Sequence, residues 1–249
     1  MKHEQIETNS GLLIILTLFV ISLGGLVEIL PLYFIDDTIE EVKFEGKETI
    51  RPYTPLELLG RDIYQREGCY LCHSQMIRPF RDEALRYGHY SLAAESQYDH
   101  PFQWGSKRTG PDLARVGKKY SNAWHVQHLD QPRSVVPDSI MPNYPWLLKN
   151  KLEYKDIADR MGSLKIVGVP YSARKSEFDT NTTRFGADVA KMLDINHAEQ
   201  NLIQQAADGN YDGNREDITE MDALVSYLQI LGTMVDFKKF DDGHFAKFR

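Results

Sequence analysis

The sequence predicts a mainly α-helical protein in which one N-terminal transmembrane helix tethers a larger domain. An uncharged, apolar run occupies residues 11–27, near the start of the chain. Apolar residues then recur at intervals of three and four, the spacing of an amphipathic helix, in residues 56–64 and again in residues 218–231. Between these two stretches lie the two cysteines of the chain, Cys69 and Cys72. The three observations predict the anchor, the helical domain and a compact site at the cysteines.

The apolar run is long enough to cross a bilayer when its continuation is included. Its 17 residues span about 26 Å, slightly less than a hydrocarbon core of about 30 Å. Apolar residues continue to position 35, so we expect a transmembrane anchor at residues 11–35, preceded by a short segment of residues 1–10. A cleaved signal peptide would need a shorter apolar core and a small-residue cleavage site, and neither occurs before Asp36.

Two features of the anchor concern its expected contacts with lipid headgroups and with another helix. Glu28 is an ionisable residue near the outer end, where its side chain is expected to reach the lipid headgroups. Ser22, Gly24 and Gly25 form a patch of small residues, which would let another transmembrane helix approach closely.

The composition excludes one broad class of partner. The chain has 249 residues, enough for one large domain or two small ones. It carries 36 acidic and 29 basic residues, for a net charge of −7. Nucleic-acid binding would require a basic face, so we expect no nucleic-acid partner.

The pattern Cys69-Tyr-Leu-Cys72-His73 is the attachment signature of a c-type haem. On a helical turn the two thiols lie at positions i and i+3, on one face, where each can form a thioether to a haem vinyl group. His73 then follows as the proximal iron ligand. A structural zinc site would need a second pair of ligands, and a thioredoxin-like pair would follow a strand. We therefore expect one covalently bound haem c.

The segments around this motif are expected to differ in structure. Residues 36–54 are predicted to form a linker or hairpin, and residues 55–68 an amphipathic helix that leads into the motif. A charged tail occupies residues 236–249.

A long polar and aromatic stretch, residues 74–110, has few helix signals and is expected to be a loop. Its aromatic side chains would cover a haem edge or contact a partner. Trp104, Lys107 and Arg108 are candidates to hold the haem propionates by charge-assisted hydrogen bonds.

The sixth iron ligand must come from elsewhere in the chain. Met141 is the preferred candidate, because it lies in a loop with Pro137 and Pro142 at its ends, which fix the backbone and can aim one side chain inward. The alternative is a bis-histidine haem that uses His125 or His128, both on a helix expected to begin near Ser121.

An inserted region, about residues 147–215, is expected before the last helix. Residues 153–164 and 187–207 are predicted to be helical within it. Residues 208–213 match the opening of a calcium loop, but Thr219 stands where a bidentate glutamate belongs, so a solvated acidic loop is expected.

Taken in order, these pieces resemble the class I cytochrome c fold, in which the first and last helices cross beside the haem. The chain resembles most closely the membrane-anchored mono-haem subunit (CcoO or FixO) of cbb3-type cytochrome c oxidases. Residues 68–79, 98–117 and 141–146 carry this resemblance. It implies a cytochrome c domain over residues 55–235, and it makes the carbonyl of Pro111 the expected acceptor for the ring N–H of His73.

The resemblance implies a function and a location. The chain would be a non-catalytic electron-transfer subunit that passes electrons to the b haems of a haem–copper catalytic subunit. The electrons would come from a di-haem or other c-type cytochrome subunit or from a soluble cytochrome c. Covalent haem c attachment implies a single-pass protein of the bacterial inner membrane, with residues 1–10 in the cytoplasm and the haem domain in the periplasm.

Three alternatives differ in what they predict. The cytochrome subunit of a nitric oxide reductase is also an anchored mono-haem protein, and the reaction of the purified complex distinguishes it. A freestanding anchored cytochrome c would purify without b-type haem. A haem enzyme or gas sensor would have a vacant sixth site and bind carbon monoxide rapidly.

Overall fold

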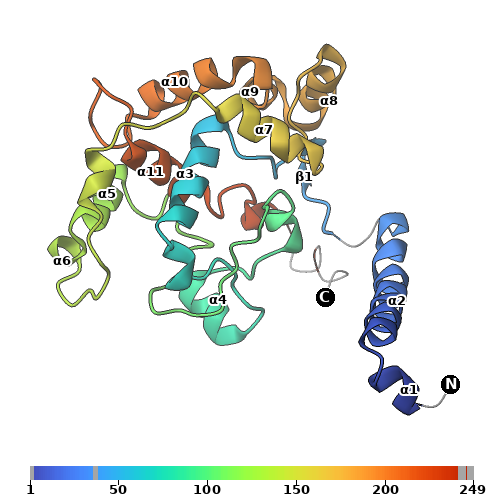
Figure 1. The fold of residues 1–249 in the computed structure, drawn as a ribbon. Helices are drawn as coiled ribbons and strands as arrows, with labels where there is room; N and C mark the ends of the chain where they lie inside the picture. The colour runs from blue at the N-terminus through green and yellow to red at the C-terminus, as the bar shows by residue number, and fades with distance from the viewer. Residues whose placement is uncertain (1–2, 36–38, 241–244, 246–249) are drawn as a thin grey trace. The chain divides into compact units, whose positions relative to one another are not determined.

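The computed structural model describes residues 3–35, 39–240 and 245, and the chain divides into two compact units (Figure 1). The first unit comprises residues 1–40 with 242–249, and the second comprises residues 41–241. Most of the described residues in regular structure are helical.

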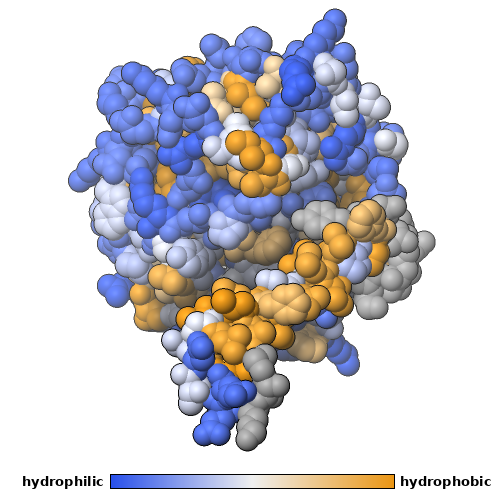
Figure 2. All heavy atoms as spheres, turned by 45° about the vertical axis from the view of Figure 1, so that its right-hand side comes forward, coloured by the Kyte–Doolittle hydropathy of each residue, from blue (hydrophilic) through white to orange (hydrophobic). Residues whose placement is uncertain are grey.

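The first unit contains one long apolar helix. A short helix, α1 (His3–Glu7), precedes α2 (Ser10–Ile29), and a 3₁₀ turn, η1 (Leu30–Phe34), follows it. Asn9 caps α2 by accepting a hydrogen bond from the Leu12 amide (3.1 Å). Among the described residues, Ser10–Leu32 is the one stretch that could cross a membrane, with 23 residues and a mean hydropathy of 2.6. Its side chains form a continuous apolar band in Figure 2.

The second unit begins with a β-hairpin, one of the two structures expected for residues 36–54. Strands β1 (Lys43–Phe44) and β2 (Lys47–Glu48) are antiparallel. Glu45 and Gly46 both have positive φ, as a tight two-residue hairpin turn requires. Arg184 holds the hairpin to the rest of the unit through Glu48 (2.8 and 3.0 Å).

The predicted first helix is confirmed as α3 (Pro55–Arg66). Its start is fixed by a capping box, in which the Thr54 amide donates to the Glu57 carboxylate (2.8 Å), and by Pro55 at the first helical position. Leu56, Leu59 and Ile63 are buried, as their spacing predicted.

The predicted last helix is confirmed as α11 (Glu220–Ile230), and it packs against α3 more extensively than any other described pair of elements. Gly60 makes this approach possible, because a Cβ at this position would lie 1.9 Å from the Ala223 carbonyl oxygen. The rings of Tyr64 and Tyr227 meet across the two helices, with centroids 5.5 Å apart.

The region between these helices is only partly as predicted. Ser121 caps α5 (Asn122–Asp130) by accepting from the Trp124 amide (3.2 Å), so the helix expected near Ser121 is confirmed. The expectation that residues 74–110 lack helices is wrong, because α4 (Arg81–Tyr87) and the 3₁₀ turn η4 (Ala93–Ser96) lie within them. The remaining elements before the insert are α6 (Pro132–Val135) and η5 (Pro145–Leu148).

The insert is more helical than predicted and its helices are shorter. The prediction for residues 153–164 is met by α7 (Ile157–Ile166) from position 157 onward, whereas α8 (Lys175–Phe185) was not expected. Residues 187–207 form three pieces because Leu193 is buried and Asp194 caps the next turn by accepting from the Asn196 amide (3.0 Å). The insert elements lie together along one side of the unit (Figure 1): α7 (Ile157–Ile166), α8 (Lys175–Phe185), α9 (Ala187–Met192), η6 (Ile195–His197) and α10 (Ala198–Gly209).

The charged tail, residues 236–249, is described only in part. Its first residues include the 3₁₀ turn η7 (Phe237–Lys239). Positions 241–244 and 246–249 lie outside the described residues.

Candidate haem-attachment site

Cys69, Cys72 and His73 lie on one tight turn directly after α3. Gly68 has a φ of 71°, which lets the chain leave the helix sharply, and the next residues form the 3₁₀ turn η3 (Cys69–Leu71). The Cys69 carbonyl accepts hydrogen bonds from the amides of Cys72 (3.1 Å) and His73 (2.9 Å). The three side chains that the motif requires are therefore carried by one short, hydrogen-bonded turn.

The two thiols have different environments. Cys69 packs against the hydrophobic core, whereas Cys72 is exposed, and neither forms a disulfide. Burial raises the pKa of the Cys69 thiol to about 12, so the free thiol is neutral near pH 7. The turn thus offers one attachment point at the core and one at the surface.

The ring of His73 is fixed on one side by the segment that follows the long loop. Its Nδ1 lies 2.8 Å from the Pro111 carbonyl oxygen. Because a carbonyl only accepts, Nδ1 must carry the proton, and Nε2 is left as the lone-pair donor. Gly110 packs flat against the ring: a Cβ there would lie 2.3 Å from Cε1 of His73.

Asp112 joins this segment to the haem-attachment motif. Its carboxylate is fully buried and accepts four hydrogen bonds, from Ser74 Oγ (2.6 Å), Ala114 N (2.8 Å), Met76 N (3.0 Å) and Arg108 Nη2 (3.1 Å). Three of these bonds end on Oδ2 and one on Oδ1, and such hydrogen bonds stabilise a buried carboxylate. The sequence alone does not identify Asp112, because its partners Ser74 and Met76 lie 38 and 36 positions away.

Arg108 was predicted to hold a haem propionate, and the structure gives its guanidinium several protein partners. It donates twice to Glu83 (both 2.7 Å), and also to Ser74 Oγ (2.6 Å) and the Met76 carbonyl (2.8 Å). The hydrogen bond from Arg108 is the main reason that the pKa of Glu83 is about 2. Arg108 therefore has a structural function of its own, and its role at a propionate stays a prediction.

The other two propionate candidates differ in their contacts with the protein. Trp104 stacks on Phe102 (ring centroids 4.3 Å apart) and donates from Nε1 to Ser96 Oγ (3.0 Å). Its carbonyl accepts from the Gln75 amide (3.0 Å), so this part of the loop runs beside the motif. Lys107 is exposed. The contacts of Trp104 and Lys107 to a haem stay predictions.

Met141 is half-buried and packs against the same core as Cys69. Its amide donates to Ser139 Oγ (3.2 Å), and Arg133 Nε donates to the Ser139 carbonyl (3.0 Å), which fixes the loop that carries it. The side chain is thus held at the inner side of its loop, as an axial ligand would require.

The two alternative ligands lie on α5. His125 is 3% exposed, and burial lowers its pKa to about 4. Burial also lowers the pKa of His128. Both rings are therefore neutral at pH 7, and His125 Nε2 and His128 Nδ1 have no hydrogen-bond partner among the described residues. The choice between Met141 and these histidines stays a prediction.

The residues around the motif fit a haem. A haem needs two thiols on one turn, an imidazole with a free Nε2, and apolar surface to cover its faces. The first two are present, and within the motif itself the side chains of Tyr70 (40% exposed) and Leu71 (63% exposed) supply hydrophobic surface that a macrocycle could cover. The described residues contain no cluster of three or more His, Cys, Asp or Glu suited to a metal ion.

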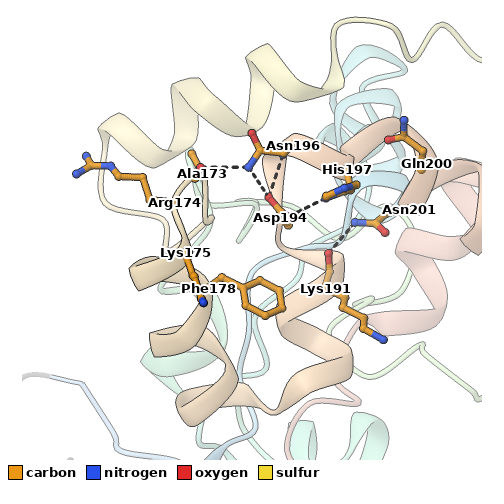
Figure 3. A pocket seen from close by; sticks show the side chains of 10 residues that line it. All are labelled: Ala173, Arg174, Lys175, Phe178, Lys191, Asp194, Asn196, His197, Gln200 and Asn201. Atoms are coloured by element: carbon orange, nitrogen blue, oxygen red, sulfur yellow. Dashed lines mark hydrogen bonds and ion pairs between the residues drawn. The ribbon is translucent and has the colours of Figure 1, made fainter.

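A pocket of about 490 Å³ lies in the insert, away from the motif in sequence (Figure 3). Asp194 sits at its centre and accepts from both Asn196 N (3.0 Å) and His197 Nδ1 (2.8 Å), while Lys175 and Lys191 lie at its edge. In the acidic loop that follows α10, Asp212 accepts from Thr219 Oγ1 (2.7 Å) and so supports the start of α11. These polar groups are used in building the insert.

The family of the chain follows from comparison with known sequences. A sequence model of the family described as "Cytochrome C oxidase, mono-heme subunit/FixO" matches residues 3–235, which is most of the chain. No curated protein matched the chain. The matched range includes the apolar helix, the turn with Cys69, Cys72 and His73, and the loop with Met141. The chain therefore belongs to the family of mono-haem subunits of cytochrome c oxidase.

Proposed function

We propose that this chain binds one haem c covalently and transfers single electrons within a cbb3-type cytochrome c oxidase. The observation that carries the proposal is the arrangement of Cys69, Cys72 and His73 on one turn, with His73 Nδ1 bonded to the Pro111 carbonyl (2.8 Å). Family membership supports a mono-haem subunit of a cytochrome oxidase.

In this proposal each side chain has a defined task. Cys69 and Cys72 form thioethers to the haem vinyl groups, and His73 Nε2 binds the iron. Pro111 fixes the His73 tautomer and strengthens the ligand by accepting the Nδ1 proton. Met141 is the sixth ligand, and its thioether favours Fe(II) and so a high potential. The haem supplies one chemistry, reversible one-electron oxidation and reduction of its iron.

In this proposal, protein ligands fill both axial positions of the iron, and this excludes oxygen reduction by the chain itself. With His73 and Met141 both bound to iron, oxygen has no open position, so oxygen reduction belongs to another subunit. The chain is then a non-catalytic subunit that hands electrons to the b haems of a haem–copper catalytic subunit. A di-haem or other c-type cytochrome subunit, or a soluble cytochrome c, supplies them.

The apolar helix supports the proposed location. Ser10–Leu32 is long enough to anchor the chain in the bacterial inner membrane. Covalent haem c attachment is a periplasmic chemistry, so the second unit is assigned to the periplasm and residues 1–10 to the cytoplasm.

Purification of the intact chain by affinity tag in mild detergent tests this function. The expected product contains haem c, b-type haem and a multi-span haem–copper subunit, and it reduces oxygen. Nitric oxide reduction by the complex would favour the nitric oxide reductase subunit instead. A free chain with haem c and no b-type haem would favour a freestanding anchored cytochrome.

A further inference from the structure

The Pro111 carbonyl can be aimed at His73 only by the residues on either side of it. Proline has no N–H of its own with which to fix its position. On one side the Gly110 amide donates to the Cys72 carbonyl (2.9 Å), and on the other the Leu113 amide donates to the Ser74 carbonyl (2.8 Å). Two backbone hydrogen bonds therefore join the segment around Pro111 to the residues that follow Cys69.

Side chains supply the rest of the connection. The buried Asp112 carboxylate binds Ser74 Oγ and the Met76 amide from the motif side, and the Ala114 amide from its own side. Arg108 bonds the same carboxylate and the same Ser74 hydroxyl. Asp112 and Arg108 thus form one network directly behind the contact between Pro111 and His73.

Glu83 completes this network from α4. Its carboxylate, 4% exposed, receives both terminal nitrogens of Arg108 (2.7 Å each). The carboxylates of Glu83 and Asp112 therefore hold the Arg108 guanidinium in one orientation. The bidentate pair with Glu83 contributes most to this, because its geometry is fixed.

We infer that Asp112 and Arg108 are positioning residues, which hold the Pro111 carbonyl on His73 and so set how strongly His73 binds the haem iron. The inference rests on the proposed function, because it concerns the ligand assigned there. A hydrogen bond from Nδ1–H raises the basicity of Nε2. Loosening the network weakens that bond, reduces donation to iron and raises the midpoint potential.

Because Asp112 and Arg108 carry opposite charges, their substitution distinguishes a positioning effect on the midpoint potential from a direct charge effect. Removing the negative charge of Asp112 raises the potential by either route. Removing the positive charge of Arg108 raises the electron density at the iron if only charge matters, and the potential then falls, because a cation near the iron favours Fe(II). If Arg108 acts by positioning, its removal loosens the same contact and the potential does not fall.

The test uses the full-length holoprotein with Asp112→Asn and, separately, Arg108→Gln. NMR measures solvent exchange of the His73 Nδ1 proton, and a redox titration measures the midpoint potential. We expect exchange to become about tenfold faster in both variants, the size expected for losing a hydrogen bond to a charged group. The potential should rise in Asp112→Asn and should not fall in Arg108→Gln.

Asp194→Asn is the matched control. Asp194 also accepts several hydrogen bonds in a loop, but it lies in the insert. It should leave the exchange rate and the potential unchanged. Ser74→Ala removes the hydroxyl bonded to both Asp112 and Arg108 and should give a smaller increase in the exchange rate. It provides a second test of the network if the Asp112→Asn protein does not fold.

Unchanged exchange in Arg108→Gln and Ser74→Ala would overturn the inference, as would a fall in potential in Arg108→Gln. That result is distinct from failure of the proposed function. If the wild-type chain carried no covalent haem, the function itself would be wrong. If it carried haem and exchange did not respond, only the positioning network would be wrong.

Discussion

Gly110 lies so close to the His73 ring that a Cβ at this position would be 2.3 Å from Cε1 and 2.7 Å from Nδ1. No side chain fits there without moving either the ring or the segment that carries Pro111. The glycine and the histidine are therefore one structural unit, even though 37 positions separate them in the sequence (110 − 73).

Gly110→Ala should displace the His73 ring and weaken its hydrogen bond to Pro111. Overpacking of this kind costs about 1–3 kcal/mol of stability. We expect a lower melting temperature and a shifted midpoint potential, measured by thermal unfolding and redox titration. The control is Gly162→Ala, because Gly162 lies within α7 and a Cβ added there would have no neighbouring atom within 4 Å; it should keep the native potential. A native potential in Gly110→Ala would contradict the prediction.

Met141→Leu should leave the haem attached but abolish the methionine–iron charge-transfer band and lower the potential, because leucine has no ligating atom. Absorption spectra of the oxidised protein provide the measurement. Met161→Leu is the control, since Met161 is fully buried in α7 and serves the core. If Met141→Leu kept the native spectrum while His125→Ala or His128→Ala lost it, a bis-histidine haem would replace this assignment.

Local sequence patterns suffice to predict some parts of the fold. The helix with Leu56, Leu59 and Ile63 and the turn with both cysteines are encoded by neighbouring residues, and both were predicted. The break in residues 187–207 was not, because Leu193 is buried against the core and only tertiary packing reveals it. The same holds for α4, whose residue Glu83 is buried by its pairing with Arg108.

Some residues of the candidate site could likewise be predicted from local sequence patterns, and others could not. The spacing of Cys69, Cys72 and His73 predicts the haem chemistry. The Pro137–Pro142 loop favours Met141, and the family resemblance adds Pro111. The network of Asp112 escaped prediction because two of its partners, Ser74 and Met76, lie 38 and 36 positions away in the sequence. Glu83 joins the network through Arg108, 25 positions away, and only the fold brings these segments together.

Acid should destabilise the fold partly through Glu83. The hydrogen bond from Arg108 holds the pKa of Glu83 at about 2, below its ordinary value of 4.5. A lowered folded-state pKa means that this stabilisation is fully present above pH 4.5 and is lost as the pH falls toward 2. We expect Glu83→Gln to unfold at a lower denaturant concentration at pH 7, with a difference from wild type that shrinks toward pH 2.

Urea unfolding at several pH values measures this effect. Glu199→Gln, at an exposed position on α10, is the control and should track wild type throughout. A difference between Glu83→Gln and wild type that stayed constant from pH 7 to pH 2 would show that Glu83 does not contribute through its charge.

The small residues of α2 should contact a partner within the membrane. Apart from the neighbouring backbone of α2 itself, no described atom lies within 4 Å of a Cβ placed on Gly24 or Gly25, so an added Cβ would not clash there. Replacing both by leucine should weaken the proposed complex in mild detergent, because close helix packing requires small residues. The haem c spectrum should stay unchanged. Co-purification of b-type haem measures the loss, and undiminished co-purification would assign the partner contact elsewhere.

The covalent haem is tested by the intact mass of the chain after denaturing purification from cells that attach haem c. We predict that the wild-type chain exceeds its polypeptide mass by one haem. The Cys69→Ala, Cys72→Ala double variant should have its polypeptide mass alone. A wild-type chain without the added mass, or a double variant that retains it, would contradict the assignment of Cys69 and Cys72 as the haem attachment points.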